Sequence, residues 1–332
     1  MQLYYEDIKE GSNLLSKSWG PLTNMDMIRF GSAVDSYGEI HQDYDWCVQH
    51  GFDNVLLSGP FKQALLCSWL DEVVGDIGYI KKIEISHRGI NYVDETLQAT
   101  GTFTKKYILD GNGFVECDIA ITNNNGLVSC PGKATLLIPM KNMDSIDFNF
   151  EPPVTYQEFI TKEISTEYTD TNNIYITKEI IEMIGAMGES YTWPEPLDIS
   201  AIRRFTQGVF ETKSRYVDIE FAKNSSIGSL IAPPAYVIRP PYGFWDKGML
   251  GESAIPVFTV PNTTVAVNGG NESEWYKVVK EGDTLTQQAR IVDIYEKKGK
   301  MRSLIPVVSE TIIVNQCNEV VALSKQINIR MP

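Results

Sequence analysis

Residues 27–43 read MIRFGSAVDSYGEIHQD, and residues 202–218 read IRRFTQGVFETKSRYVD. These are two copies of one segment, because Phe30 and His41 lie 175 residues before Phe205 and Tyr216. A histidine in one copy therefore stands where the other copy has a tyrosine. Histidine is the side chain best suited to proton transfer near neutral pH. The pair predicts one catalytic half and one supporting half.

The length of the chain agrees with a duplication. With 332 residues, of which 43% are hydrophobic, it is longer than a usual single domain and can bury two cores. A double proline, Pro152-Pro153, follows the last expected strand of the first half. We therefore expect a first domain over residues 1–150 and a second over residues 151–332.

The charge pattern limits the classes of partner. A net charge of -14 argues against nucleic acid, which requires a clustered basic face. No apolar run approaches the roughly 18 residues of a membrane span, and the first residues lack the pattern of a signal peptide. We expect a cytoplasmic protein that binds neither nucleic acid nor membranes.

The cysteines and histidines indicate no metal site. Five cysteines, an odd number, are widely spaced without a Cys-x-x-Cys pair, which is typical of reduced and mostly buried thiols. The three histidines show no ligand spacing with them. These residues are Cys47, Cys67, Cys117, Cys130, Cys317, His41, His50 and His87. We expect no metal, and we interpret His50 and His87 as structural.

The first half has two stretches with a helical pattern, followed by a stretch with a strand pattern. Residues 24–34 have apolar side chains at helical spacing after a capping-type Asn24, so a short helix leads into the loop that carries His41. Residues 60–74 are apolar on most faces and end at Gly75, which predicts a buried helix. Residues 80–139 favour three or four antiparallel strands, because they are rich in Ile, Thr, Val and Tyr and broken by Gly-Asn turns.

The second half repeats this order. Residues 57–60, Leu-Ser-Gly-Pro, return as Ile-Ala-Pro-Pro at 231–234, and Asp-Glu-Thr-Leu at 94–97 returns as Gly-Asp-Thr-Leu at 282–285. A hairpin is expected at residues 297–300. The copy departs at Pro240-Pro241, which should stop the second helix soon after Tyr236 and leave a loop that shapes a substrate pocket. Helices followed by antiparallel strands predict an α+β fold.

The first half resembles the MaoC-like dehydratases and (R)-specific enoyl-CoA hydratases. Residues 33–43, the loop through Phe52 and residues 57–60 carry this resemblance. The second half is similar to the catalytically silent hot-dog domain of the two-domain members. The matching segments are 202–205, 232–234, 268–270 and 282–285. The resemblance implies a double hot-dog fold, in which each of two domains is a long helix wrapped by an antiparallel sheet.

The resemblance also implies a lyase that adds water to, or removes it from, a 2-enoyl thioester of coenzyme A or a carrier protein. In the family an aspartate and a histidine five positions later hold the water, and a backbone N–H at the start of the buried helix binds the thioester carbonyl. His41 matches the histidine and Gly59 matches the glycine at that helix start. No cofactor is expected beyond the carrier of the substrate.

The chain departs from the family at the aspartate. Ser36 stands five positions before His41, and Asp35 lies one residue further back. We predict that a one-residue shift lets Asp35 hold the water; the alternative is that the acid is missing and the activity is altered or lost. Ser58 also stands where hydratases usually carry a histidine. Ser36 and Ser58 are therefore secondary candidates for the site.

Substrate contacts are expected from Pro60 and from basic residues that could pair with coenzyme A phosphates. Among these residues Arg88 is the preferred candidate. The others are Lys81, Lys82, Lys105 and Lys106.

Two other functions stay open. A hot-dog thioesterase would hydrolyse the thioester, with Gln63 or Asp71 as the candidate residue; a non-catalytic acyl-thioester-binding pseudoenzyme would explain Ser36. In the second copy the corresponding loop carries Glu211, Lys213 and Tyr216. Tyrosine is a poor base at neutral pH, so this copy is expected to be silent and to complete a pseudo-dimer. We expect two such chains to form a homodimer.

Overall fold

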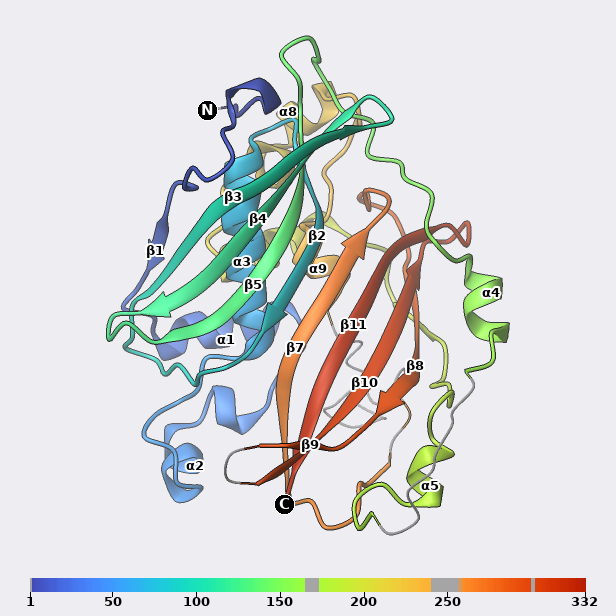
Figure 1. Ribbon diagram of the computed structural model, residues 1–332. Helices are drawn as coiled ribbons and strands as arrows, with labels where there is room; N and C mark the ends of the chain where they lie inside the picture. Colours follow the sequence, from blue (N-terminus) through green and yellow to red (C-terminus); the bar gives the residue numbers. More distant parts are fainter. Residues whose placement is uncertain (1, 165–172, 240–255, 257, 300–301) are drawn as a thin grey trace.

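The computed structural model describes the chain except residues 1, 165–172, 240–255, 257 and 300–301. Its central feature is one antiparallel sheet that runs through both halves, in the order β1-β3-β4-β5-β2-β7-β11-β10-β8-β6, with β9 paired to β10. Figure 1 shows the long helix α3 (Gly59–Val74) against the face of the first-half strands that lies away from the viewer. The helix and the strands around it form the hot-dog arrangement that the sequence predicts.

The first half contains the predicted helices and four long strands. The sequence predicted Asn24 as the capping residue. Helix α1 instead begins at Asn24 with Thr23 as its N-cap, because the Thr23 side chain accepts the Asp26 N–H and the Asp26 carboxylate accepts the Thr23 N–H. The elements are η1 (Tyr5–Asp7), β1 (Lys17–Trp19), α1 (Asn24–Ala33), η2 (Glu39–His41), α2 (Tyr44–Gln49), α3, β2 (Tyr79–Ser86), β3 (Leu97–Leu109), β4 (Asn112–Asn123) and β5 (Val128–Ile138).

Helix α3 is buried on nearly all sides, as its apolar sequence predicts. Ser58 caps its N-terminus, Pro60 occupies the first turn, and Gly75 ends it with a φ of 75°, in the left-handed region that glycine tolerates. The β3–β4 hairpin turns at Asp110 and Gly111, both with positive φ, which is typical of a two-residue type I′ turn. Capping and turn residues thus set the bounds of these elements.

The second half repeats the order with short helices. Its helix α9 (Pro234–Val237) corresponds to the start of α3 but has a single turn, in agreement with the predicted early stop; Pro240-Pro241 lie outside the described residues. The other elements are α4 (Tyr156–Thr161), α5 (Lys178–Ile181), β6 (Tyr191–Thr192), α6 (Ile199–Gly208), α7 (Ser214–Val217), α8 (Ile219–Asn224), β7 (Val265–Trp275), β8 (Thr286–Ile294), β9 (Lys297–Lys298), β10 (Ser303–Val314) and β11 (Val320–Met331).

The backbone conserves the duplicated segment. Asp35 has a φ of 57° after α1, and Phe210, 175 residues later, has a φ of 56° after α6. The two helices pack against each other, with the rings of Phe30 and Phe205 6.1 Å apart. The two copies therefore share one turn as well as one sequence pattern, and they meet where α1 packs against α6.

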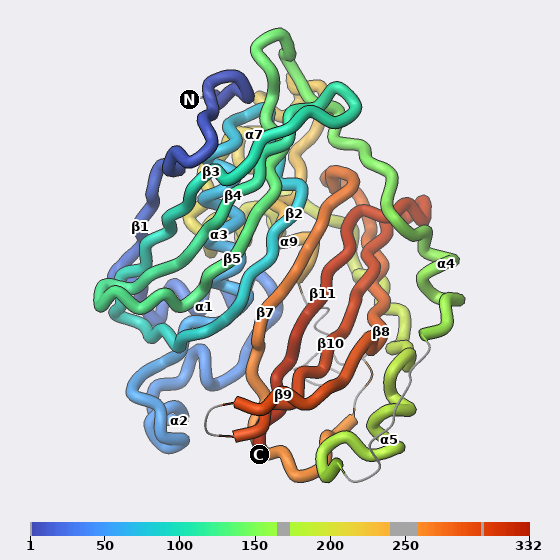
Figure 2. The backbone as a smooth tube through the Cα atoms, in the orientation of Figure 1, coloured from blue at the N-terminus to red at the C-terminus, as the bar shows by residue number. Residues whose placement is uncertain are grey.

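The halves are joined through the sheet. Strand β2 of the first half pairs with β7 of the second, from Lys82 opposite Glu274 to Ser86 opposite Gly270. In Figure 2 the blue-to-green strands and the orange-to-red strands follow one another without a break. The Phe150 N–H donates to the Tyr276 carbonyl at 2.8 Å, so the chain already contacts the second half where we predict the boundary at residues 150–151. That division into domains stays a prediction.

Candidate active site

The start of α3 presents one free backbone donor. The Ser58 hydroxyl accepts the Phe61 N–H at 3.2 Å, the Ser58 carbonyl accepts the Lys62 N–H at 3.1 Å, and Pro60 has no N–H. The remaining N–H of this first turn, that of Gly59, donates to no group in the described part of the chain. Because the helix dipole is positive at this end, Gly59 offers a donor for a developing negative charge. Ser58 anchors the turn by capping it.

His41 is fixed to the segment that leads into α3. Its Nδ1 lies 2.9 Å from the Leu56 carbonyl oxygen, and the Leu56 N–H donates to the Ile40 carbonyl at 3.1 Å. A carbonyl can only accept, so Nδ1 carries the proton and Nε2 keeps its lone pair. Burial lowers the pKa of His41, against the opposing effect of the Leu56 hydrogen bond, and the nearby Lys62 cation lowers it further. His41 is thus a neutral imidazole with a free basic nitrogen.

Asp35 and Ser36 point to different places. Asp35 has a side chain that is 56% exposed, and its Oδ2 lies 3.3 Å from Nη1 of Arg239. Ser36 lines the pocket between the halves. Its N–H donates to the Gly31 carbonyl at 2.9 Å, and its carbonyl accepts a hydrogen bond from Gln42 Nε2 at 2.7 Å. The geometry therefore favours Ser36 over the predicted Asp35 as the residue next to a substrate.

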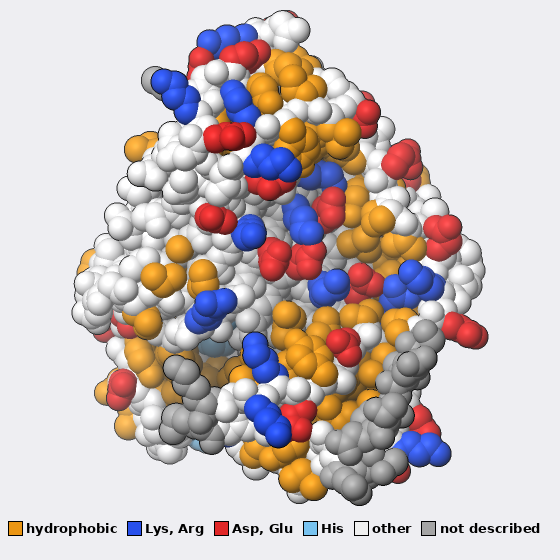
Figure 3. All heavy atoms as spheres, viewed as in Figure 1, with side chains coloured by type: hydrophobic (Ala, Val, Ile, Leu, Met, Phe, Trp, Pro, Cys, Tyr) orange, Lys and Arg blue, Asp and Glu red, His pale blue; other side chains and the backbone are white. Residues whose placement is uncertain are grey.

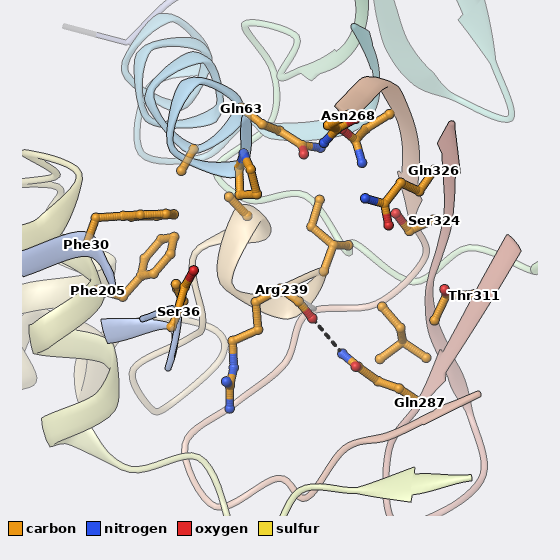
Figure 4. Close-up of a pocket in the computed structure, with 17 residues that line it drawn as sticks. Phe30, Ser36, Gln63, Phe205, Arg239, Asn268, Gln287, Thr311, Ser324 and Gln326 are labelled. Atoms are coloured by element: carbon orange, nitrogen blue, oxygen red, sulfur yellow. Dashed lines mark hydrogen bonds between the residues drawn. The ribbon is translucent and has the colours of Figure 1, made fainter. Parts of the chain in front are cut away.

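The pocket that Ser36 lines lies between α1, α3 and the second-half sheet and encloses about 60 Å³. Figure 4 shows Phe30 and Phe205 on one side and a row of amide and hydroxyl side chains on the other. Pro60 lines it, as predicted for a substrate contact. His41 is not among its lining residues; its loop reaches the pocket through Ser36.

Two side chains that the sequence did not predict for the site border Gly59. A Cβ at Gly59 would lie 3.0 Å from His87 Nε2 and 3.1 Å from Asn268 Nδ2. Asn268 comes from β7 of the second half, so both halves reach the start of α3. The Asn268-Gly269-Gly270 motif was a sequence signal for the fold alone, and His87 was interpreted as structural.

Hydrogen bonds fix the orientation of these groups. The Gly270 N–H donates to Asn268 Oδ1 at 3.0 Å, so Asn268 Nδ2 faces the other way and donates to Asn271 Oδ1 at 3.1 Å. His87 Nε2 lies 3.4 Å from that same oxygen, which assigns the proton to Nε2, while Nδ1 faces Cys130 Sγ at 3.8 Å. Burial lowers the pKa of His87 to about 4, so the ring is neutral at pH 7. The second hydrogen of Asn268 Nδ2 therefore remains as a donor beside Gly59, whereas the one N–H of His87 is directed at Asn271.

Comparisons with known proteins place this site in a known fold. A model of the FAS1-like dehydratase domain region matches residues 183–324. A MaoC domain protein dehydratase from Chloroflexus aurantiacus superposes with a TM-score of 0.68 at 12% identity, covering 100% of this chain and 97% of that one. A conserved protein from Mycobacterium tuberculosis with a double hot-dog fold gives 0.66 at 12% identity, covering 100% and 99%.

The chain has the double hot-dog fold of the MaoC-like dehydratases. The resemblance predicted from residues 33–43 and 57–60 is confirmed at the level of the fold, and the match to a dehydratase region lies in the second hot-dog unit. No curated protein sequence matches the chain.

The second hot-dog unit uses its copy of the loop that carries His41 to dock on α3. Asp71 of α3 forms ion pairs with Arg215 and with Lys213, the latter at 3.4 Å, and both partners are buried. Glu211 accepts backbone N–H groups, and burial together with the Asp71 charge raises its pKa to about 7. Tyr216 is 2% exposed, and burial raises its pKa well above 10. These side chains hold the two units together and leave Tyr216 without basic character at neutral pH.

The basic residues predicted to contact coenzyme A differ in whether their side chains already have partners in the protein. Figure 3 shows basic and acidic side chains interspersed over the open face of the double hot-dog sheet. The Arg88 side chain is exposed and has no ion pair or hydrogen bond among the described residues, whereas the four lysines have partners. Lys81 pairs with Glu274, Lys82 with Glu272 and Lys105 with Glu116, and Lys106 donates to the Tyr5 and Ile8 carbonyls. Arg88 remains the candidate with a free cation.

The described residues also bear on the expectations for metals, membranes and thiols. They contain no group of three or more His, Cys, Asp and Glu side chains placed to hold a metal ion. No helix among the described residues is both long enough and apolar enough to span a membrane. Cys47, Cys67, Cys117 and Cys130 are buried free thiols and Cys317 is an exposed one, which agrees with the sequence interpretation.

Proposed function

We propose that this chain is an acyl-thioester hydratase or dehydratase, which adds water to, or removes it from, the double bond of a 2-enoyl group on coenzyme A or a carrier protein. The observation that carries the proposal is the hydrogen bond from His41 to Leu56, which fixes a neutral imidazole on the segment that ends at the free Gly59 N–H. A base and an oxyanion donor are the two groups that this reaction requires.

In the hydration direction, His41 Nε2 takes a proton from a water molecule as the water oxygen bonds to the β-carbon. The electrons of the double bond move toward the thioester carbonyl, and its oxygen gains negative charge that the Gly59 N–H stabilises. The imidazolium of His41 then returns a proton to the α-carbon. Dehydration follows the same steps in reverse, and no proton is left over.

Three further side chains have supporting roles in this proposal. Ser36, which lines the pocket, orients the water by hydrogen bonding, a role predicted for Asp35. Asn268 borders Gly59, and the Nδ2 hydrogen that is not directed at Asn271 can stabilise the same carbonyl oxygen, while the His87 Nε2–H holds Asn271 in place. Because burial lowers the pKa of His87 to about 4, this ring adds no full charge beside Gly59 at neutral pH.

The thioesterase alternative has less support from the site. Of its two candidate residues, Gln63 lines the pocket. Asp71, the only carboxylate of the two, does not line it, is buried, and is held by Arg215 and Lys213. The pseudoenzyme alternative rests on Ser36 in place of the family's aspartate. A pseudoenzyme would bind a 2-enoyl thioester without converting it, so only a measurement of turnover distinguishes it from a hydratase.

The test is to incubate the protein with a set of 2-enoyl-CoA thioesters and record enone absorbance together with free thiol. We expect absorbance to fall without thiol release, and we expect His41→Ala to abolish the change. Thiol release would indicate hydrolysis, and binding of the thioesters without either change would indicate a pseudoenzyme.

A further inference from the structure

A buried lysine lies on the first turn of α3, the turn that begins with Gly59. Lys62 is 3% exposed and comes three residues after Gly59, on the same side of the helix. Its Nζ donates to the Gly89 carbonyl at 3.0 Å and to Asn91 Oδ1 at 3.3 Å. A lysine is almost never fully buried unless it is paired, because removing the ammonium group from water is costly. The surroundings of Lys62 must therefore stabilise this cation.

A hydrogen-bonded chain connects Lys62 to a carboxylate. Asn91, which is 0% exposed, accepts from Lys62 through Oδ1 and donates through Nδ2 to Glu95 Oε2 at 2.9 Å. The Asn123 amide donates to that same oxygen at 3.1 Å, so Glu95 is held as an acceptor. Because the Asn91 amide lies between the two charges, the carboxylate cancels the field of the ammonium group only in part.

The groups that hold Lys62 are neighbours of two histidines near the site. The Leu57 N–H donates to the Asn91 carbonyl at 2.8 Å, and Leu57 follows the residue whose carbonyl fixes His41. Gly89, the other acceptor, comes two residues after His87 in the chain. Lys62 is thus anchored between the segment that orients His41 and the loop that begins with His87.

The charge of Lys62 acts on both rings. Burial lowers the pKa of His41, the Leu56 hydrogen bond opposes this, and the Lys62 cation lowers the pKa further. Burial and then the same cation lower the pKa of His87 to about 4. Lys62 is therefore a cation that the two rings have in common. The other titratable groups near these side chains are Asp43, Cys47, Arg88, Tyr92, Glu95 and Cys130.

We propose that Lys62 is a positioning residue of the active site, whose ammonium charge keeps His41 neutral and thereby sets the lowest pH at which His41 acts as a base. Glu95 limits this effect from the other end of the Asn91 bridge. The inference rests on the proposed function, because it takes His41 as the base. It assigns Lys62 no contact with the substrate.

Two substitutions that each remove one charge test this role. Lys62→Gln leaves an amide that can still donate to the loop, and Glu95→Gln removes the opposing charge. NMR titration of the histidine side chains, of which the chain has three, measures the result. We expect Lys62→Gln to raise the pKa of His41 by about 0.5 or more and Glu95→Gln to lower it. A merely structural role would not move the pKa in opposite directions.

Lys133→Gln is the matched control, because it removes the same charge at an exposed position of β5. It should leave the pKa of His41 within about 0.2 of the wild type, since water and salt screen an exposed charge. The signal of the exposed His50 should be the same in every variant. An unchanged or lowered pKa of His41 in Lys62→Gln would overturn the inference. If that variant does not fold, Glu95→Gln decides, and an unchanged or raised pKa overturns it.

The pH dependence of hydration provides a second measurement. The midpoint of the fall in kcat/KM at low pH should move up in Lys62→Gln and down in Glu95→Gln, together with the pKa of His41. The NMR titration needs no substrate, so the two proposals are tested separately. Opposite shifts without turnover of any 2-enoyl-CoA would support the role of the Lys62 charge and overturn the hydratase. Turnover with no shift in either variant would leave the hydratase standing and overturn the inference.

Discussion

At the scale of single residues, the candidate site depends on the hydrogen bonds that hold His41 and leave the Gly59 N–H free. His41 and Gly59 were found because their types and spacing match a known pattern, and their local hydrogen bonds suit the predicted roles. The choice between Asp35 and Ser36 depends on one backbone turn with a φ of 57°, which sequence spacing does not reveal. Asn268 reaches Gly59 from the other half, and no local pattern predicts such a contact.

Replacing Ser36 and Asp35 separately tests which of them holds the water. We expect Ser36→Ala to lower kcat/KM by about tenfold or more, because a hydrogen bond that orients the nucleophile is lost. Asp35→Asn should change it by less than about threefold, since Asp35 is exposed and pairs with Arg239. Steady-state hydration kinetics measure both, and the reverse order of effects would restore Asp35 to the predicted role.

The pH dependence of hydration reports the state of His41. Because burial lowers its pKa, the neutral base persists below pH 6.5, the ordinary value. We expect kcat/KM to fall as the pH is lowered and His41 becomes protonated, with a midpoint below pH 6.5. A midpoint at or above pH 6.5 would contradict a buried His41 base.

At the scale of elements, the helices and strands followed from caps, turns and periodicity. Gly75 ends α3 where the sequence predicted, and the Asp110-Gly111 turn joins β3 to β4. The N-cap of α1 was misplaced by one residue, because Thr23 and Asn24 are both good capping residues and the deciding bond comes from Asp26. The free donor at Gly59 is a property of the whole first turn of α3.

Gly59→Ala tests that first turn. The new methyl group would lie 3.0 Å from His87 Nε2 and 3.1 Å from Asn268 Nδ2, so it fills the space beside the free N–H. We expect kcat/KM for hydration to fall by at least about tenfold, while the free energy of unfolding changes by less than about 1 kcal/mol, because alanine favours a helix. Ser32→Ala, at an exposed position of α1, is the control. Full activity in Gly59→Ala would remove this N–H from the mechanism.

At the scale of the whole molecule, the repeat in the sequence predicted two similar halves but not how they join. The β2–β7 pairing connects residues 82–86 to 270–274, and the Asp71 ion pairs connect α3 to the loop of the second copy. Pairings across such distances depend on the packed fold rather than on local pattern. In the second copy the loop has become a docking element, which explains why Tyr216 replaces histidine without loss of the fold.

Asp71→Asn tests this docking. Two buried cations, Arg215 and Lys213, would lose their carboxylate, so the free energy of unfolding should fall by about 3–5 kcal/mol. Glu72→Gln is the neighbouring control, because its ion pair with Lys17 is partly exposed and should matter by less than about 1 kcal/mol. Urea unfolding measures both, and an equal effect of the two changes would show that the buried pairs do not hold the units together.

The most direct test of the central claim compares the two corresponding residues in hydration of a 2-enoyl-CoA thioester. The account predicts that His41→Ala lowers kcat by about 10²–10⁴-fold, because the general base is lost, while folded Tyr216→Phe keeps activity within about threefold of the wild type. Activity that survives in His41→Ala, or that disappears in folded Tyr216→Phe, would contradict a catalytic first half and a silent second half.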